Sequence, residues 1–113
     1  MNALPPVPSY PNAVSSQADP SDRLHYIAPI VAADALERAI QWLAANERGQ
    51  VIERGPSFAH VVVTTRWLRF KDDVHLLWDG AALQIRSASR LGKGDLGANR
   101  KRMEALRAAL VNG

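Results

Sequence analysis

The chain of 113 residues contains no cysteine. This absence excludes a disulfide framework, a thiolate metal site and a cysteine nucleophile. The chain also has no apolar run of about 18 residues, the length that a transmembrane helix needs. Its N-terminus lacks the basic start and apolar core of a secretory signal. As written, the sequence is therefore expected to be cytoplasmic, and it would be envelope-associated if a leader or an anchor had been removed from it.

Composition is that of an ordinary globular domain with a proline-rich start. Hydrophobic residues make up 47% of the chain and charged residues 22%. We expect an arm over residues 1–24 and a single α+β domain over residues 25–113. The arm holds five of the seven prolines, which favours an extended chain. Either it is a disordered tail, or it lies across the domain, anchored by Tyr10 and Val14.

The positive charge is concentrated in one stretch, from Ile85 to Arg102. Six of the fourteen basic residues and one of the eleven acidic residues lie there, so the stretch carries +5 and the rest of the chain −2. The net charge of +3 is modest for a nucleic-acid-binding protein, and no nucleic-acid-binding motif is present. We therefore expect no nucleic-acid partner.

The pattern of apolar residues predicts two helices and four strands. Leu36, Ile40 and Leu43 form one helical face, and Met103, Leu106 and Leu110 form another. Alternating and β-branched residues predict strands, and Asp79-Gly80 predicts a hairpin. The expected helices span about 34–47 and 97–111, and the expected strands are 50–54, 58–70, 74–79 and 82–87, with a turn at 72–73. The fold class follows as an α+β two-layer sandwich, a four-stranded antiparallel sheet covered on one face by two helices, with an extended N-terminal arm.

The glycine-rich turn before the second helix admits two interpretations. Asp95 is placed to cap the nitrogens of Gly97 and Ala98, and to pair with Arg90 or Arg100, which would make the turn an internal brace. Alternatively, free helix nitrogens together with Arg86, Arg90 and Arg100 would form an anion site, because guanidinium groups match carboxylate and phosphate oxygens. Gly92, Gly94 and Gly97 fit a dinucleotide-binding spacing, but only 16 residues follow, too few for the second parallel strand.

Evidence for catalysis or for a bound cofactor is thin. Ser87 or Ser89 with Asp95 and a histidine would suit a hydrolase, yet no nucleophile elbow is present. The three histidines lack the close spacing of a metal site, and we assign no cofactor, metal or catalytic residue. Trp67, between two arginines, is expected in the core; if exposed, it would suit a partner surface or lipid headgroups.

Four segments resemble a known family. They are Asn12-Ala-Val-Ser-Ser, Tyr26-Ile-Ala-Pro29, Arg66-Trp-Leu-Arg-Phe-Lys-Asp-Asp-Val74 and, above all, Arg86-Ser-Ala-Ser-Arg-Leu-Gly-Lys-Gly-Asp-Leu-Gly-Ala-Asn-Arg-Lys-Arg102. They resemble the bacterial Domain of Unknown Function 1499 family, over about residues 8–110. Ala13 stands where that family has a cysteine, so a thiol-based role is not expected here. The resemblance implies an envelope-associated role and a candidate site made of the polar motif positions, namely Arg86, Ser87, Ser89, Arg90, Asp95, Asn99 and Arg100.

Three functions remain open from the sequence. The first is a non-enzymatic binding domain whose basic strand, turn and helix (residues 86–102) hold an anionic small molecule, a headgroup or an acidic protein partner. The second is the serine hydrolase described above. The third is a structural module in which the basic turn is an internal ion-paired brace.

Overall fold

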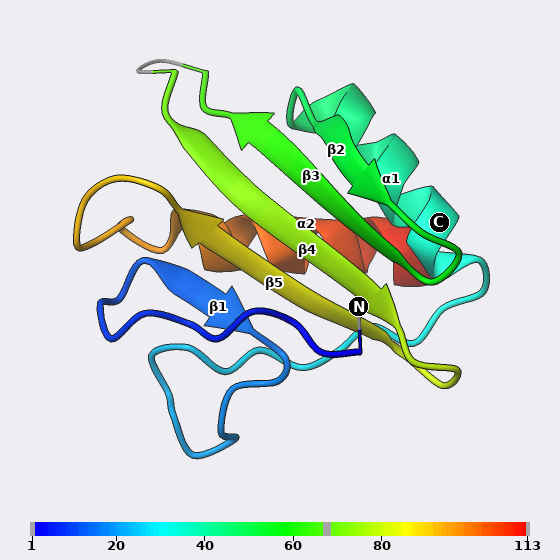
Figure 1. Ribbon diagram of the computed structural model, residues 1–113, viewed down its shortest axis with the longest axis horizontal. Coiled ribbons are helices and arrows are strands. Elements are labelled where there is room, and N and C mark those ends of the chain that lie inside the picture. The colour runs from blue at the N-terminus through cyan, green and yellow to red at the C-terminus, as the bar shows by residue number, and fades with distance from the viewer. Residues whose placement is uncertain (1, 67–68, 113) are drawn as a thin grey trace.

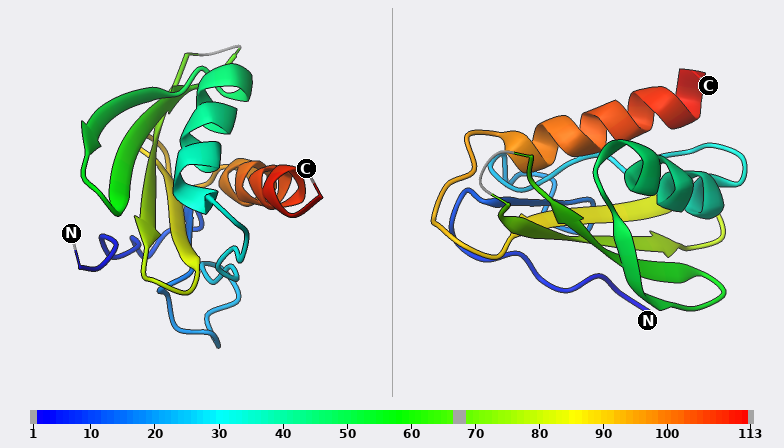
Figure 2. Two further views of the ribbon diagram at one scale, coloured as in Figure 1. Left: turned by 90° about the vertical axis from the view of Figure 1, so that its right-hand side faces the viewer. Right: turned by 90° about the horizontal axis from the view of Figure 1, so that it is seen from above.

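The computed structural model describes residues 2–66 and 69–112, which form one sheet and two helices (Figure 1). The sheet is antiparallel and five-stranded, in the order β1-β5-β4-β3-β2. Both helices lie on one face of it, and the first residues of the arm run along the other, which we call the arm face (Figure 2). The elements are β1 (Ala13–Ser15), α1 (Ala35–Asn46), β2 (Gln50–Arg54), β3 (Phe58–Thr64), β4 (Lys71–Trp78), β5 (Leu83–Ser89) and α2 (Ala98–Asn112).

The α+β class and the packing of both helices on the sheet are confirmed, but the expected number of strands was wrong. The fifth strand is β1, which comes from the proline-rich arm and pairs with β5 through Ala13↔Ala88 and Val14↔Ser87. A three-residue strand has no readable periodicity of its own, and its pairing depends on the exposed edge that β5 offers. Val14 enters the core beneath the helices, so the arm is part of the sheet.

The turn expected at Asp72 and Asp73 was also wrong. Both residues lie inside β4, opposite Val63 and Val62 of β3. Aspartate is rare in strands, but each of these carboxylates has a cationic partner, Arg102 for Asp72 and Arg90 for Asp73. These ion pairs with distant arginines therefore outweigh the low strand propensity of aspartate. The prediction for Trp67 falls outside the described residues.

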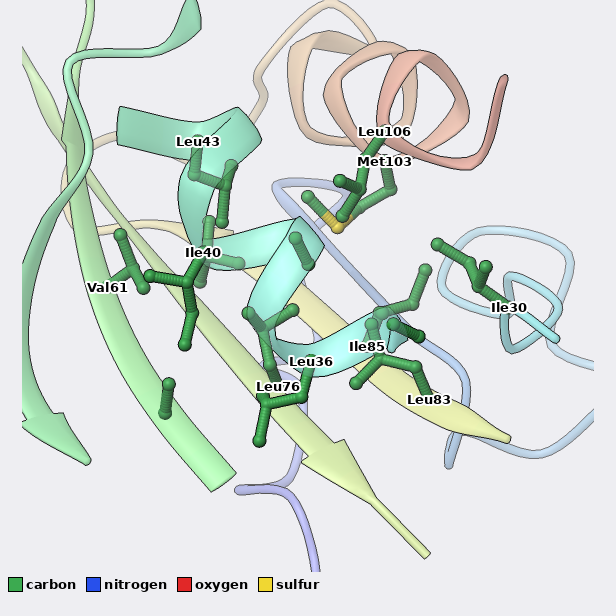
Figure 3. Packing of buried hydrophobic residues seen from close by; sticks show 14 of the residues in the cluster. Ile30, Leu36, Ile40, Leu43, Val61, Leu76, Leu83, Ile85, Met103 and Leu106 are labelled. Carbon is green, nitrogen blue, oxygen red and sulfur yellow. The ribbon is translucent and has the colours of Figure 1, made fainter. Parts of the chain in front are cut away.

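The core fills the space between the sheet and the two helices (Figure 3). Leu36, Ile40 and Leu43 of α1 are buried as the sequence predicted, against strands that contribute Val61 and Leu76. Burial of each such side chain contributes about 1.5 to 3 kcal/mol. Met103 and Leu106 anchor α2 in the same cluster, so the start of α2 is fixed beside the end of β5.

Candidate functional site

The glycine-rich turn spans residues 90–97, between the end of β5 and the start of α2. Asp95 caps the helix: its carboxylate accepts hydrogen bonds from the backbone nitrogens of Gly97 (2.8 Å) and Asn99 (3.2 Å). The nitrogen of Ala98 donates to the backbone carbonyl of Asp95 at 3.0 Å. Burial alone would raise the pKa of Asp95, but the hydrogen bonds from Asn99 and Gly97 outweigh it and lower the pKa. The carboxylate therefore occupies the nitrogens of Gly97 and Asn99, whereas the nitrogen of Ala98, which we expected it to cap, is occupied by the backbone carbonyl.

Asn99 is the centre of a buried hydrogen-bond network that joins four of the predicted residues. Its side-chain nitrogen donates to Ser89 Oγ (2.9 Å) and to Asp95 (2.7 Å). Its side-chain oxygen accepts from Ser87 Oγ at 2.6 Å. Ser87 and Asn99 are completely buried, and no histidine of the described residues hydrogen-bonds either serine. Nothing in this arrangement favours the hydrolase alternative.

Arg102 completes the network, although the sequence analysis did not single it out. It forms ion pairs with Asp72 and Glu47, both at 2.9 Å, and donates a hydrogen bond to Ser87 Oγ at 3.1 Å. A signal was available, because residue 102 lies four positions before Leu106 and so falls on the buried stripe of the helix. Arg102 therefore braces α2 against β4 and α1.

Arg86 and Arg90 lie on the arm face, away from this network, because side chains alternate along a strand. Arg90 binds Asp73 through two hydrogen bonds of 2.8 and 2.9 Å. Asp73 also contacts His60 at 2.7 Å. The hydrogen bonds of Arg90, with those of His60, lower the pKa of Asp73 to about 2 despite its burial. Arg86 donates to the backbone carbonyl of Pro6 at 2.9 Å and so ties the arm to the sheet.

A histidine pair lies beside Arg86 on the same face. His75 is opposite Arg86 in the register of β4 and β5, and its ring stacks on that of His60 with the centroids 4.1 Å apart. Burial, followed by the neighbouring His60 and Arg86, lowers the pKa of His75 to about 4. His75 Nδ1 and Arg86 Nε are buried without a partner among the described residues. The sheet therefore holds His75 in its neutral form at neutral pH.

Arg100, the last of the predicted residues, lines a surface hollow of about 220 Å³ that we call the arginine hollow. Its guanidinium reaches only the backbone carbonyls of Arg23 and Leu24, both at the long distance of 3.5 Å. The side chain of Arg23 has no hydrogen bond or ion pair within the described part of the chain. The hollow is lined by Pro11, Ala13, Val14, Arg23, Leu24, Asp95, Gly97 and Arg100.

The predicted site residues thus divide into three groups. Ser87, Ser89, Asp95 and Asn99 form the buried network; Arg86 and Arg90 lie on the arm face; Arg100 lies at the arginine hollow. Ala13, which stands where the resembled family has a cysteine, is buried in the edge strand β1.

A second hollow, of about 370 Å³, lies on the other side of the glycine-rich turn. Its apolar rim is formed by Phe70, Leu91 and Leu96, and its polar floor includes Asp72 and Ser89. In residues 2–66 and 69–112 no group of three or more histidine and carboxylate side chains is placed to hold a metal ion. No helix in these ranges combines the length and apolar character needed to cross a membrane.

The fold and the turn together define a small α+β domain whose last helix is joined to its N-terminal strand by a buried polar network. The chain belongs to the family described as a protein of unknown function (DUF1499), which matches residues 3–110. The resemblance read from the glycine-rich turn is thereby confirmed. No curated protein and no solved structure matches the chain.

Proposed function

We propose that this protein is a non-enzymatic binding domain that holds an anionic group, such as a phosphate, between Arg23 and Arg100. The observation that carries the proposal is that these two guanidinium groups border the same hollow and have no carboxylate partner among the described residues. Guanidinium groups bind phosphate and carboxylate oxygens through paired N–H donors, and such charge-assisted hydrogen bonds are about twice as strong as neutral ones.

Three other arginines of the basic stretch already have partners within the protein, so they serve as braces. Arg90 is held by Asp73, Arg102 by Asp72 and Glu47, and Arg86 by the carbonyl of Pro6. Arg100 differs because carbonyl contacts of 3.5 Å leave its donors free to turn toward an incoming anion. The structural-module alternative therefore accounts for Arg86, Arg90 and Arg102 but gives Arg23 and Arg100 no role.

Asp95 also borders the hollow, and its negative charge would oppose an anion. Its oxygens, however, already accept hydrogen bonds from Gly97 and from both nitrogens of Asn99. We therefore place the anion on the side of the hollow where the two arginines lie.

The test is a titration with inorganic phosphate and with glycerol phosphate, followed by calorimetry and by thermal unfolding. A ligand at 100 times its dissociation constant should stabilise the wild type by about 2.7 kcal/mol, a shift of several degrees for a domain of this size. The Arg23→Ala/Arg100→Ala variant should bind at least about tenfold more weakly, because each lost charged hydrogen bond costs about 1.5 to 3 kcal/mol.

Arg54→Ala is the matched control. Arg54 is exposed on β2 and pairs with Glu37, so its loss removes one positive charge elsewhere on the surface, where the double variant removes two from the hollow. The control should bind both anions as the wild type does. Equal binding by the double variant and the wild type would disprove the proposal and leave the turn as a structural brace.

A further inference from the structure

Two loops at one end of the sheet expose large apolar side chains next to each other. One is the β3–β4 loop, described at residues 65–66 and 69–70, and the other is the glycine-rich turn; together we call them the loop tip (Figure 1). Phe70 is 47% exposed, Leu91 67% and Leu96 100%. At the base of the two loops, the nitrogen of Arg90 donates a hydrogen bond of 3.2 Å to the carbonyl of Lys71, the first residue of β4. The three apolar residues line one hollow.

Leu96 has no structural reason to be a leucine. Its φ is 54°, in the left-handed region that glycine adopts without strain, and it gains no burial in exchange. An exposed apolar side chain held in an unfavourable backbone conformation points to a role outside the fold. Its side chain is fully exposed on the turn, as that of a residue entering a separate apolar phase would be.

Basic residues border these apolar side chains. Arg66 and Arg69 lie on one loop and Lys93 on the other, and none has an ion pair with a carboxylate in the described ranges. Lys93 instead lies over the ring of Tyr10, 5.4 Å from its centroid. The nearby acidic residues are engaged internally. Asp72 pairs with Arg102 and Asp73 with Arg90. The carboxylate of Asp95 accepts hydrogen bonds from Gly97 and Asn99. The loop tip therefore presents unpaired positive charge around an apolar crest.

We propose that the loop tip docks onto an anionic lipid membrane. Phe70, Leu91 and Leu96 enter the boundary between headgroups and acyl chains, while Arg66, Arg69 and Lys93 meet lipid phosphates. A membrane is the occupant that this chemistry favours, because a crest of projecting apolar residues bordered by basic ones matches the layering of an anionic bilayer surface. A protein partner would instead have to supply a cavity for Leu96.

The position of the arginine hollow agrees with this geometry. Asp95 borders both hollows, so Arg23 and Arg100 lie on the other side of the same turn. A lipid phosphate is thus a candidate for the anion of the arginine hollow, and in this one respect the inference rests on the proposed function. Insertion of the apolar crest stands apart from it, because it needs neither Arg23 nor Arg100.

The experiment is co-sedimentation of the whole protein with vesicles of phosphatidylcholine mixed with phosphatidylglycerol in equal parts, and with vesicles of phosphatidylcholine alone. Wild-type protein should sediment with the anionic vesicles, and added salt should weaken binding as it screens the basic residues. Leu91→Ser/Leu96→Ser should weaken the partition by about tenfold or more, because each leucine gives up its burial in the bilayer.

Val31→Ser is the matched apolar control. Val31 is 71% exposed and follows Ile30, which pairs with Leu83 at the opposite end of β5. It should bind vesicles as the wild type does. Failure of the wild type to bind anionic vesicles, or equal binding by the double leucine variant, would overturn the docking proposal. Vesicle binding that depends on the leucines while phosphate titration fails would reject only the arginine hollow.

Discussion

Asn99 donates a hydrogen bond of 3.1 Å from its side-chain nitrogen to the backbone carbonyl of Asn12, 87 positions earlier in the sequence. The side chain of Asn12 in turn donates to the carbonyl of Gly92 at 2.9 Å. The arm, the glycine-rich turn and α2 are thus held together by two asparagines. These hydrogen bonds hold the turn that carries Leu96, and the start of α2 that carries Arg100, against the arm.

Replacing Asn99 with alanine should destabilise the domain strongly. The change leaves the buried O–H donor of Ser87 without its acceptor, which costs about 1 to 3 kcal/mol. It also removes one of the two hydrogen bonds to the carbonyl of Asn12, which keeps the backbone nitrogen of Ser89 as a donor. We expect a loss of about 2 to 4 kcal/mol in the free energy of unfolding, measured in urea. Asn46→Ala, at an exposed asparagine, should change it by less than about 1 kcal/mol. A similar small loss at Asn99 would show that the network does not support the turn.

His75 should make the protein less stable as the pH falls from about 6.5 to about 4. Burial beside His60 and Arg86 holds its pKa at about 4, whereas the unfolded chain binds the proton near the ordinary value of 6.5. Protons therefore favour the unfolded state in this window, and the stability present above pH 6.5 falls by about 2 to 3 kcal/mol. In His75→Phe this decrease in the free energy of unfolding between pH 6.5 and about 4 should disappear. Urea denaturation of both proteins at several pH values measures it.

His25 acts in the opposite direction. Burial lowers its pKa, but hydrogen bonds with the carbonyl of Tyr10 and with Asp22 outweigh burial and raise it. Its contribution is therefore complete below its unfolded pKa and is lost as the pH rises through the folded value. The wild type and His75→Phe both contain His25, so the difference between their pH profiles of stability reports His75 alone. Parallel pH profiles for wild type and His75→Phe would contradict the prediction.

Leu96→Gly should stabilise the domain and weaken membrane binding at the same time. Glycine adopts the φ of 54° without strain, and relief of a left-handed residue yields about 0.5 to 1 kcal/mol after the entropy that glycine costs. Leu91 has no positive φ, so Leu91→Gly should weaken vesicle binding without raising stability. Urea denaturation and co-sedimentation measure the two effects. A destabilised Leu96→Gly would mean that the leucine serves the fold.

Much of the fold could be predicted from the sequence because its helices and longer strands carry clear periodicities. The buried faces of α1 and α2 follow from residues such as Leu43 and Leu106. The strand β1 could not be predicted, because its three residues are ordered by the edge of β5. Nor could Asp72 and Asp73, whose place in β4 depends on arginines from α2 and from the turn after β5.

The candidate site shows the same division. The capping of α2 by Asp95 was predicted from local spacing and agrees with its hydrogen bond to Gly97. Side chains alternate along a strand, so the sequence already implied that Arg86 and Arg90 lie on the opposite face of the sheet from Ser87 and Ser89. The predicted site nevertheless placed all four residues together. The proximity of Arg23 and Arg100 could not be predicted from the sequence, because only the tertiary fold brings the end of the arm, at Arg23, next to α2.

The most direct test of a binding surface at the glycine-rich turn is a proton–nitrogen correlation spectrum of the wild type titrated with glycerol phosphate. We expect progressive, saturable shifts at the amides and arginine side chains that border the arginine hollow, above all Arg23, Gly97 and Arg100. Amides of β2, at the far edge of the sheet, should not move. Shifts confined to β2 or to the hollow beside Glu37 and Arg54, or no saturable shift at Arg100, would contradict this expectation.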